Sequence, residues 1–172
     1  MMMFAACAKN GNQAMNGAAD SAKMTADSNI AGMKSFYENV INAHNADVLD
    51  KYCAVNFVDH NPDPGTDGNG LDNNKKNFKG WFASMPDVHM TIDRIAADGD
   101  YVWTMWTMSG TMKGDMGSMK ATGKSAKVSG VDIVHIKDGK AIERWGYFDQ
   151  MSMMQQFGLM PPPPGAPAEK KM

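Results

Sequence analysis

The sequence predicts an α+β domain in which a curved, mainly antiparallel sheet wraps around helices that precede it. Three observations indicate this class. Apolar residues recur at helical spacing between Ile30 and Phe82. From Val88 onward they alternate with polar residues, as in half-buried strands. Asp98-Gly99 and Asp138-Gly139 are strong signals for tight turns between such strands.

The helical half of the chain is predicted to contain three helices. Asp27-Ser28 supplies good N-cap residues for the first, which ends near Asn45. A short second helix is expected over Val48–Val55, followed by a loop rich in proline and glycine up to residue 70. The third begins at Leu71 and stops at Met85-Pro86, because proline disfavours a helical conformation in the residue before it.

The second half is predicted to be strands. The expected strands are Val88–Ala96, Tyr101–Thr111, Ala126–Ile136 and Ala141–Phe148. A glycine-rich connection separates the second and third. A last short helix is expected over Met151–Phe157, and Gly158 suits its C-cap.

Composition sets limits on function. The 172 residues are 43% hydrophobic and 21% charged, as in a soluble globular domain, and the net charge is −2. No basic stripe indicates a nucleic-acid partner, and no run of about 20 apolar residues indicates a membrane span. The 18 methionines are spread at helix and strand periods, which favours core filling over a soft-metal tract.

The two ends of the chain are expected to lie outside the domain. Phe4-Ala5-Ala6-Cys7 resembles a bacterial lipobox, so residues 1–7 are interpreted as the remnant of a lipoprotein signal with Cys7 as the lipidated residue. Residues 8–27 suit a flexible tether, 28–160 form the domain, and 161–172 form a proline-rich tail. A lipid anchor would place the protein in the bacterial cell envelope. The alternative is a ragged N-terminus with a chance cysteine on a cytoplasmic protein.

The hairpin around Asp138-Gly139 carries an unusual mixture of side chains. With these two residues as the loop, Asp132 faces Trp145 and Val134 faces Glu143 on one face of the pair. A carboxyl group beside buried aromatic surface has a raised pKa and can exchange a proton near neutral pH. A solvent-facing wall with incidental acids would have the same pattern. On this register the whole face consists of Val128, Asp132, Val134, Glu143, Trp145, Tyr147 and Asp149.

Several segments together resemble the SnoaL-like polyketide cyclase (ester cyclase) family of the nuclear-transport-factor-2-like superfamily. They are FVDHNPDPG, GDYVWTMWTMSGTMKG and ATGKSAKVSGVDIVHIKDGKAIERWGYFDQMSMMQQFGLM, within residues 30–161. The resemblance implies a cone-shaped α+β barrel with an apolar pocket, and a homodimer packed through the outer sheet face. It also implies ring closure by aldol condensation with an acidic general acid/base and no cofactor or metal. Many members carry Gly-Thr-His where this chain has Gly110-Thr111-Met112, and Met112 cannot move a proton.

Asp132 is the first candidate for an acid/base, with His60 or Tyr147 polarising a substrate oxygen. Each candidate has a structural alternative: an ion-paired Asp132, an exposed loop residue at His60, and a helix cap at Asp149. No His, Asp, Glu or Cys grouping has metal-ligand spacing. The residues expected to line the pocket are Trp81, Trp106, Met112, Glu143, Trp145 and Asp149.

Three functions are compatible with these observations. The first is a cofactor-free cyclase, isomerase or dehydratase that acts on an apolar, carbonyl-containing small molecule. The second is a module that binds such a molecule without turnover. The third is a structural scaffold whose cone is filled by its own methionines, which predicts that there is no open cavity.

Overall fold

One curved, open sheet of five strands organises the molecule, with the strand order β1-β5-β4-β3-β2. The computed structural model describes residues 7–63 and 65–161, with side-chain surroundings from Asp20 onward. Four strands pair antiparallel, and β1 pairs parallel with β5, so the sheet is mixed. The strands are β1 Cys53–Asp59, β2 His89–Asp98, β3 Tyr101–Thr111, β4 Ser125–Lys137 and β5 Lys140–Phe148.

The helices are α1, α2 and α3, with two short helical segments between α1 and β1. Helix α1 spans Cys7–Phe36 and continues directly into the π-helical segment η1, Tyr37–Asn42. The 3-10 segment η2, Ala46–Lys51, then leads into β1. Helix α2 spans Leu71–Ser84, and α3 spans Gln150–Gln156.

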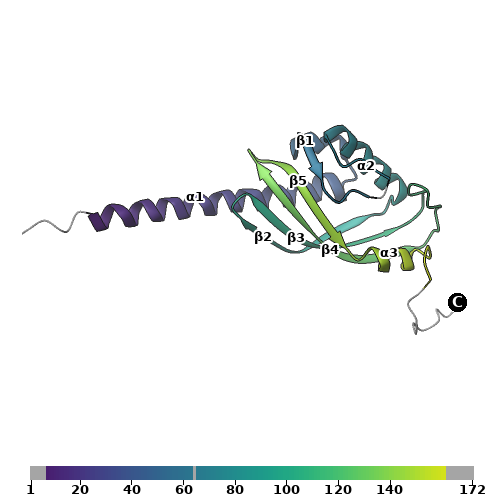
Figure 1. Cartoon of the computed structure of the whole chain (residues 1–172). Coiled ribbons are helices and arrows are strands. Elements are labelled where there is room, and N and C mark those ends of the chain that lie inside the picture. Colours follow the sequence, from purple (N-terminus) through teal and green to yellow (C-terminus); the bar gives the residue numbers. More distant parts are fainter. Residues whose placement is uncertain (1–6, 64, 162–172) are drawn as a thin grey trace, which may run out of the picture.

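The helices cover the concave face of the sheet. Helix α1 packs on β2 and β3, α2 packs on η2 and β1, and α3 packs on β4. Figure 1 shows that the N-terminal part of α1 projects beyond the sheet. Met24 in α1 is 72% exposed, whereas Met33 and Tyr37, further along the chain, are buried.

Strand β3 shows how period-2 alternation creates two faces. Val102, Thr104, Trp106 and Met108 point inward and are at most 5% exposed, whereas Trp103 points outward and is 37% exposed. Successive strand residues point to opposite faces, so the sequence pattern predicts this division. The inner face of the sheet and the helices over it bury one hydrophobic core.

The predicted register of the β4–β5 hairpin was wrong. Asp138 and Gly139 do form the two-residue loop, both with positive φ, and Lys137 faces Lys140. However, the register shifts beside Ile142, so that His135, and not Val134, faces Glu143. One additional residue in a strand moves every later side chain to the opposite face. Asp132 therefore faces Gly146, and Trp145 faces Ile133.

One further expectation differs from the structure. The predicted helix Val48–Val55 is instead η2 followed by β1, whose burial does not alternate because the strand lies at the edge of the sheet. Residues 8–27 are helical, as part of α1, and their role as a tether stays a prediction. Their many alanines favour the helix, since alanine has the highest helix propensity. Phe4–Ala6 and the tail from residue 162 lie outside the described residues, and the lipidation of Cys7 stays a prediction.

Candidate functional site

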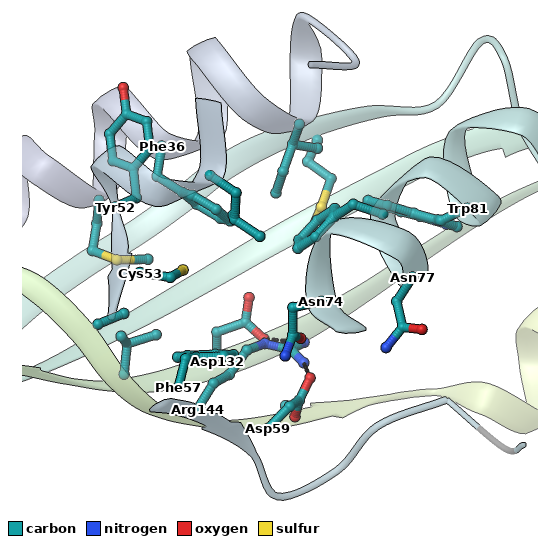
Figure 2. Close-up of a pocket in the computed structure, with 18 of the residues that line it drawn as sticks. Phe36, Tyr52, Cys53, Phe57, Asp59, Asn74, Asn77, Trp81, Asp132 and Arg144 are labelled. Carbon is teal, nitrogen blue, oxygen red and sulfur yellow. Dashed lines mark hydrogen bonds and ion pairs between the residues drawn. The ribbon is translucent and has the colours of Figure 1, made fainter. Parts of the chain in front are cut away.

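A cavity of about 320 Å³ lies between the helices and the inner face of the sheet. Its wall is mostly apolar and includes six methionines: Met33, Met85, Met90, Met108, Met116 and Met153. Aromatic rings from α1 and α2, among them Phe36 and Trp81, complete the upper wall in Figure 2. This cavity contradicts the filled-scaffold hypothesis. Its size and apolar lining are typical of small-molecule sites.

A chain of polar groups crosses the wall of this cavity. The Arg144 guanidinium lies between two carboxylates (Figure 2). Its Nε and Nη2 donate to Oδ1 of Asp132 at 3.0 and 2.7 Å, and its Nη1 donates to Oδ2 of Asp59 at 2.7 Å. The Tyr37 hydroxyl donates to the other oxygen of Asp132 at 2.7 Å. The chain therefore brings α1–η1, β1, β4 and β5 together at one point.

Burial makes these contacts strong. The Asp132 and Asp59 side chains are only 8% and 12% exposed, and that of Arg144 is 30% exposed. Burial opposes the charge on Arg144, but the carboxylates of Asp132 and Asp59 outweigh it and raise the pKa of the guanidinium. Burial, together with the Asp132 charge, also raises the pKa of Tyr37 well above its usual value. The phenol therefore remains a hydrogen-bond donor at neutral pH.

Glycines in the strands make room for this arrangement. A Cβ at Gly146 would collide with the Arg144 guanidinium, which lies directly over this residue. A Cβ at Gly130 would meet the ring of Trp106 at 2.5 Å, so the indole contacts the backbone of β4 directly. Glycine inside a strand often marks such a close approach. The two glycines thus position the main cation and the largest inner ring of the cavity.

Two more titratable groups border the cavity. Asp63 follows β1 in the loop at the cavity edge, where the residue is exposed, and partial burial of its carboxyl raises its pKa. Arg144 opposes this rise, and the Asp59 charge adds to it. Burial raises the pKa of the Cys53 thiol to about 12, so it stays protonated at neutral pH and is a poor nucleophile.

The structure brings three of the predicted site residues to the cavity. Asp132, Trp81 and Trp106 all line it. Met112 is fully buried in the core but does not belong to the cavity wall, and its Sδ lies 4.0 Å from the Thr122 hydroxyl. Asp149 caps α3, where its Oδ1 accepts from the backbone N–H of Ser152 at 2.9 Å.

The other predicted residues lie on the outer face of the sheet, because of the register shift. Trp145 stacks on His60, with ring centroids 4.5 Å apart, and His60 Nε2 lies 3.4 Å from Oε2 of Glu143. Tyr147 is 53% exposed. We therefore correct the expectation that Glu143, Trp145 and Tyr147 share a face with Asp132. His60 is an exposed loop residue that contacts this outer group.

The sequence reasoning missed Arg144, Tyr37, Asp59 and Asp63 as members of the site. The predicted register leaves Arg144 off the face that carries Asp132, and Tyr37 lies inside the helix that was predicted to end near Asn45. Gly146 was the available signal, since a glycine in the middle of an aromatic strand indicates a close approach to its backbone. Nothing local links Tyr37 to Asp132, which lies 95 residues further along the chain.

Comparison with known proteins identifies the family. The profile of the SnoaL-like polyketide cyclase family matches residues 31–157, most of the chain. The chain belongs to this family. The match begins within α1 and ends just after α3, so it contains the whole sheet and every member of the buried polar chain. No curated protein gives a significant match.

Solved structures of SnoaL-like proteins share the fold. A putative polyketide cyclase from Acidithiobacillus ferrooxidans is 26% identical, with a TM-score of 0.66 over 77% of this chain and 95% of that one. A putative SnoaL-like polyketide cyclase from Jannaschia sp. is 17% identical, with a TM-score of 0.70 over 80% and 96%. IdmH, a putative polyketide cyclase from Streptomyces antibioticus, is 23% identical, with a TM-score of 0.65 over 76% and 98%. These likenesses place the chain in the nuclear-transport-factor-2-like α+β fold.

Within the described residues, no helix is long and apolar enough to cross a membrane. In the same part of the chain, no three His, Cys, Asp or Glu side chains gather as a metal site would require.

Proposed function

We propose that the cavity binds a mostly apolar small molecule that carries a carbonyl group. The observation that carries the proposal is the buried chain Tyr37–Asp132–Arg144–Asp59 on the wall of an otherwise apolar cavity. Sites for small molecules combine apolar walls with a few fixed polar groups that orient the ligand. Family membership supports the same class of function.

Two kinds of N–H donor belong to the cavity wall. Arg144 has five N–H groups, and three of them are used by the two carboxylates. The buried Nε1–H of Trp106, another residue of the cavity wall, has no partner among the described residues. An unsatisfied buried donor costs free energy, but this N–H is closed off from the cavity space, so Arg144 is the donor that a ligand can reach.

Cofactor-free proton transfer next to the carbonyl is a second candidate. Asp132 keeps its place as the proposed proton acceptor, because it lies on the cavity wall and its carboxylate is held in position there by hydrogen bonds from Arg144 and Tyr37. The observation that favours turnover is the presence of two acids, Asp132 and Asp63, on the wall of one cavity, with the pKa of Asp63 raised as in many acid/base sites. His60 and Tyr147 have no part in this mechanism, because they lie outside the cavity.

A single ketone can test both binding and proton transfer. 2-Acetonaphthone has an apolar body, one carbonyl and acetyl protons that exchange with deuterium when a base removes them. We expect calorimetry to show saturable binding at one site, and NMR in D₂O to show faster loss of the acetyl proton signal in the presence of the protein.

Variants separate the two functions. Asp132→Asn and Asp63→Asn should each be titrated with the ketone and assayed for exchange, with Asp98→Asn, at an exposed turn, as the control. If binding persists but no exchange occurs even in the wild-type protein, the domain is a binding module. Absence of saturable binding to the wild-type protein would contradict the proposed function.

A further inference from the structure

The charges around the cavity are unbalanced. Among the described residues that line it, the carboxylates are Asp59, Asp63 and Asp132, and the only basic side chain is Arg144. Since Arg144 is already paired with two carboxylates, its charge is more than neutralised before a ligand enters. Even with Asp63 protonated, the wall keeps an excess of one negative charge.

Two neutral side chains on the wall also favour a ligand that donates hydrogen bonds. The amide nitrogen of Asn74 donates to the backbone oxygens of Gly68 and Gly70, at 3.0 and 2.8 Å. The amide nitrogen of Asn77 donates to the backbone oxygen of Asp67 at 2.8 Å. The amide oxygens of both residues receive no hydrogen bond from the described part of the chain. Both residues belong to the cavity wall (Figure 2), so each adds an amide oxygen that can accept a hydrogen bond from a ligand.

Aromatic rings on the wall also favour a positively charged ligand. Phe78 lies at the centre of an aromatic group on the cavity wall, with its ring centroid 6.0 Å from those of both Phe36 and Trp81. The faces of such rings attract cations. In a cavity from which most water is excluded, charge interactions of this kind are stronger than in bulk water.

We propose that the cavity selects its apolar ligand by charge, accepting a protonated amine and rejecting a carboxylate or phosphate. This inference rests on the proposed binding function and narrows its ligand class. A carboxylate in the cavity would lie near at least two fixed carboxylates, and the one guanidinium there is already shared between them. An ammonium group would find acceptors and aromatic faces on several sides.

Three probes with the same naphthalene body test the inference: 2-naphthylmethylamine, 2-naphthylmethanol and 2-naphthoate. We expect calorimetry at pH 7 and low salt to show that the amine binds about tenfold more tightly than the carboxylate, or better, with the alcohol between them. Asp63→Asn should lower the ratio of amine to carboxylate affinity by about threefold. Asp98→Asn removes an equal charge from an exposed turn between β2 and β3, and should preserve the ratio.

The results distinguish this inference from the function on which it rests. If the alcohol binds and the carboxylate binds as tightly as the amine, selection by charge is overturned while ligand binding stands. A ratio that falls equally in Asp63→Asn and Asp98→Asn would also overturn it, since the preference would then come from overall charge. If no probe binds, the proposed function fails and the inference fails with it.

Discussion

At the scale of single residues, the buried Tyr37–Asp132 hydrogen bond is the most testable contact. Both side chains are buried, and the contact joins the end of α1 to the middle of β4. Since the pKa of Tyr37 is raised in the folded protein, the folded state holds the phenolic proton more tightly than the unfolded chain does. The contribution of Tyr37 to stability is therefore fully present below about pH 10 and is lost as the pH rises above that value.

We expect Tyr37→Phe to lower the free energy of unfolding by about 1–2 kcal/mol at pH 8, because a hydrogen bond to a buried charge is lost. Between pH 10 and 11 the gap to the wild-type protein should shrink by about 1 kcal/mol, because the tyrosine of the unfolded chain is half deprotonated at pH 10 and almost wholly deprotonated at pH 11. Urea unfolding at several pH values measures this. Tyr147→Phe, at an exposed ring, is the control. If the difference in free energy of unfolding between the wild-type protein and Tyr37→Phe stays constant up to pH 11, the phenol of Tyr37 is not held protonated by burial beside Asp132.

At the scale of the element, β5 shows why glycine is needed opposite Asp132. We expect Gly146→Ala to destabilise the protein by about 2 kcal/mol, because the new Cβ displaces the Arg144 guanidinium from its buried carboxylates. Gly80→Ala is the matched comparison in α2: nothing lies within 4 Å of its Cβ, so the change should stabilise the helix by about 0.5–1 kcal/mol. Denaturant unfolding measures the change in the free energy of unfolding for both variants. If Gly146→Ala and Gly80→Ala change it equally, the close approach of the Arg144 guanidinium to Gly146 does not contribute to stability.

The secondary structure was largely predictable from the sequence, and the site was not. Alternation and turn residues placed β2 to β5 within two residues of their ends, because strand periodicity is a local signal. The shift beside Ile142 has no local signal, and it alone moved Arg144 from the predicted outer face to the cavity. Strand β1 was missed because its pairing with β5 is parallel and distant in sequence.

At the scale of the whole molecule, the outer face of the sheet is the main exposed apolar surface. Cross-strand rows join Trp103, Ile133 and Trp145, and next to them Met105, Val131 and Tyr147. Several of these side chains are more than one-third exposed. The homodimer implied by the family resemblance would cover this face, and it stays a prediction.

Light scattering should then give twice the 18.7 kDa mass of one chain for the wild-type protein. A Trp103→Glu variant, which places a charge in this face, should give the mass of a single chain.

The central claim is that the cavity between helices and sheet binds an apolar ligand, and methionine-methyl NMR tests it most directly. Six methionines line the cavity, whereas Met24, Met105 and Met151 are more than half exposed elsewhere. With ¹³C-labelled methionine methyl groups, 2-acetonaphthone should shift the cavity signals along one saturable curve and leave the exposed ones unchanged. Shifts centred on Met105 would place binding on the outer face of the sheet, and no shift at any cavity methionine would contradict the claim.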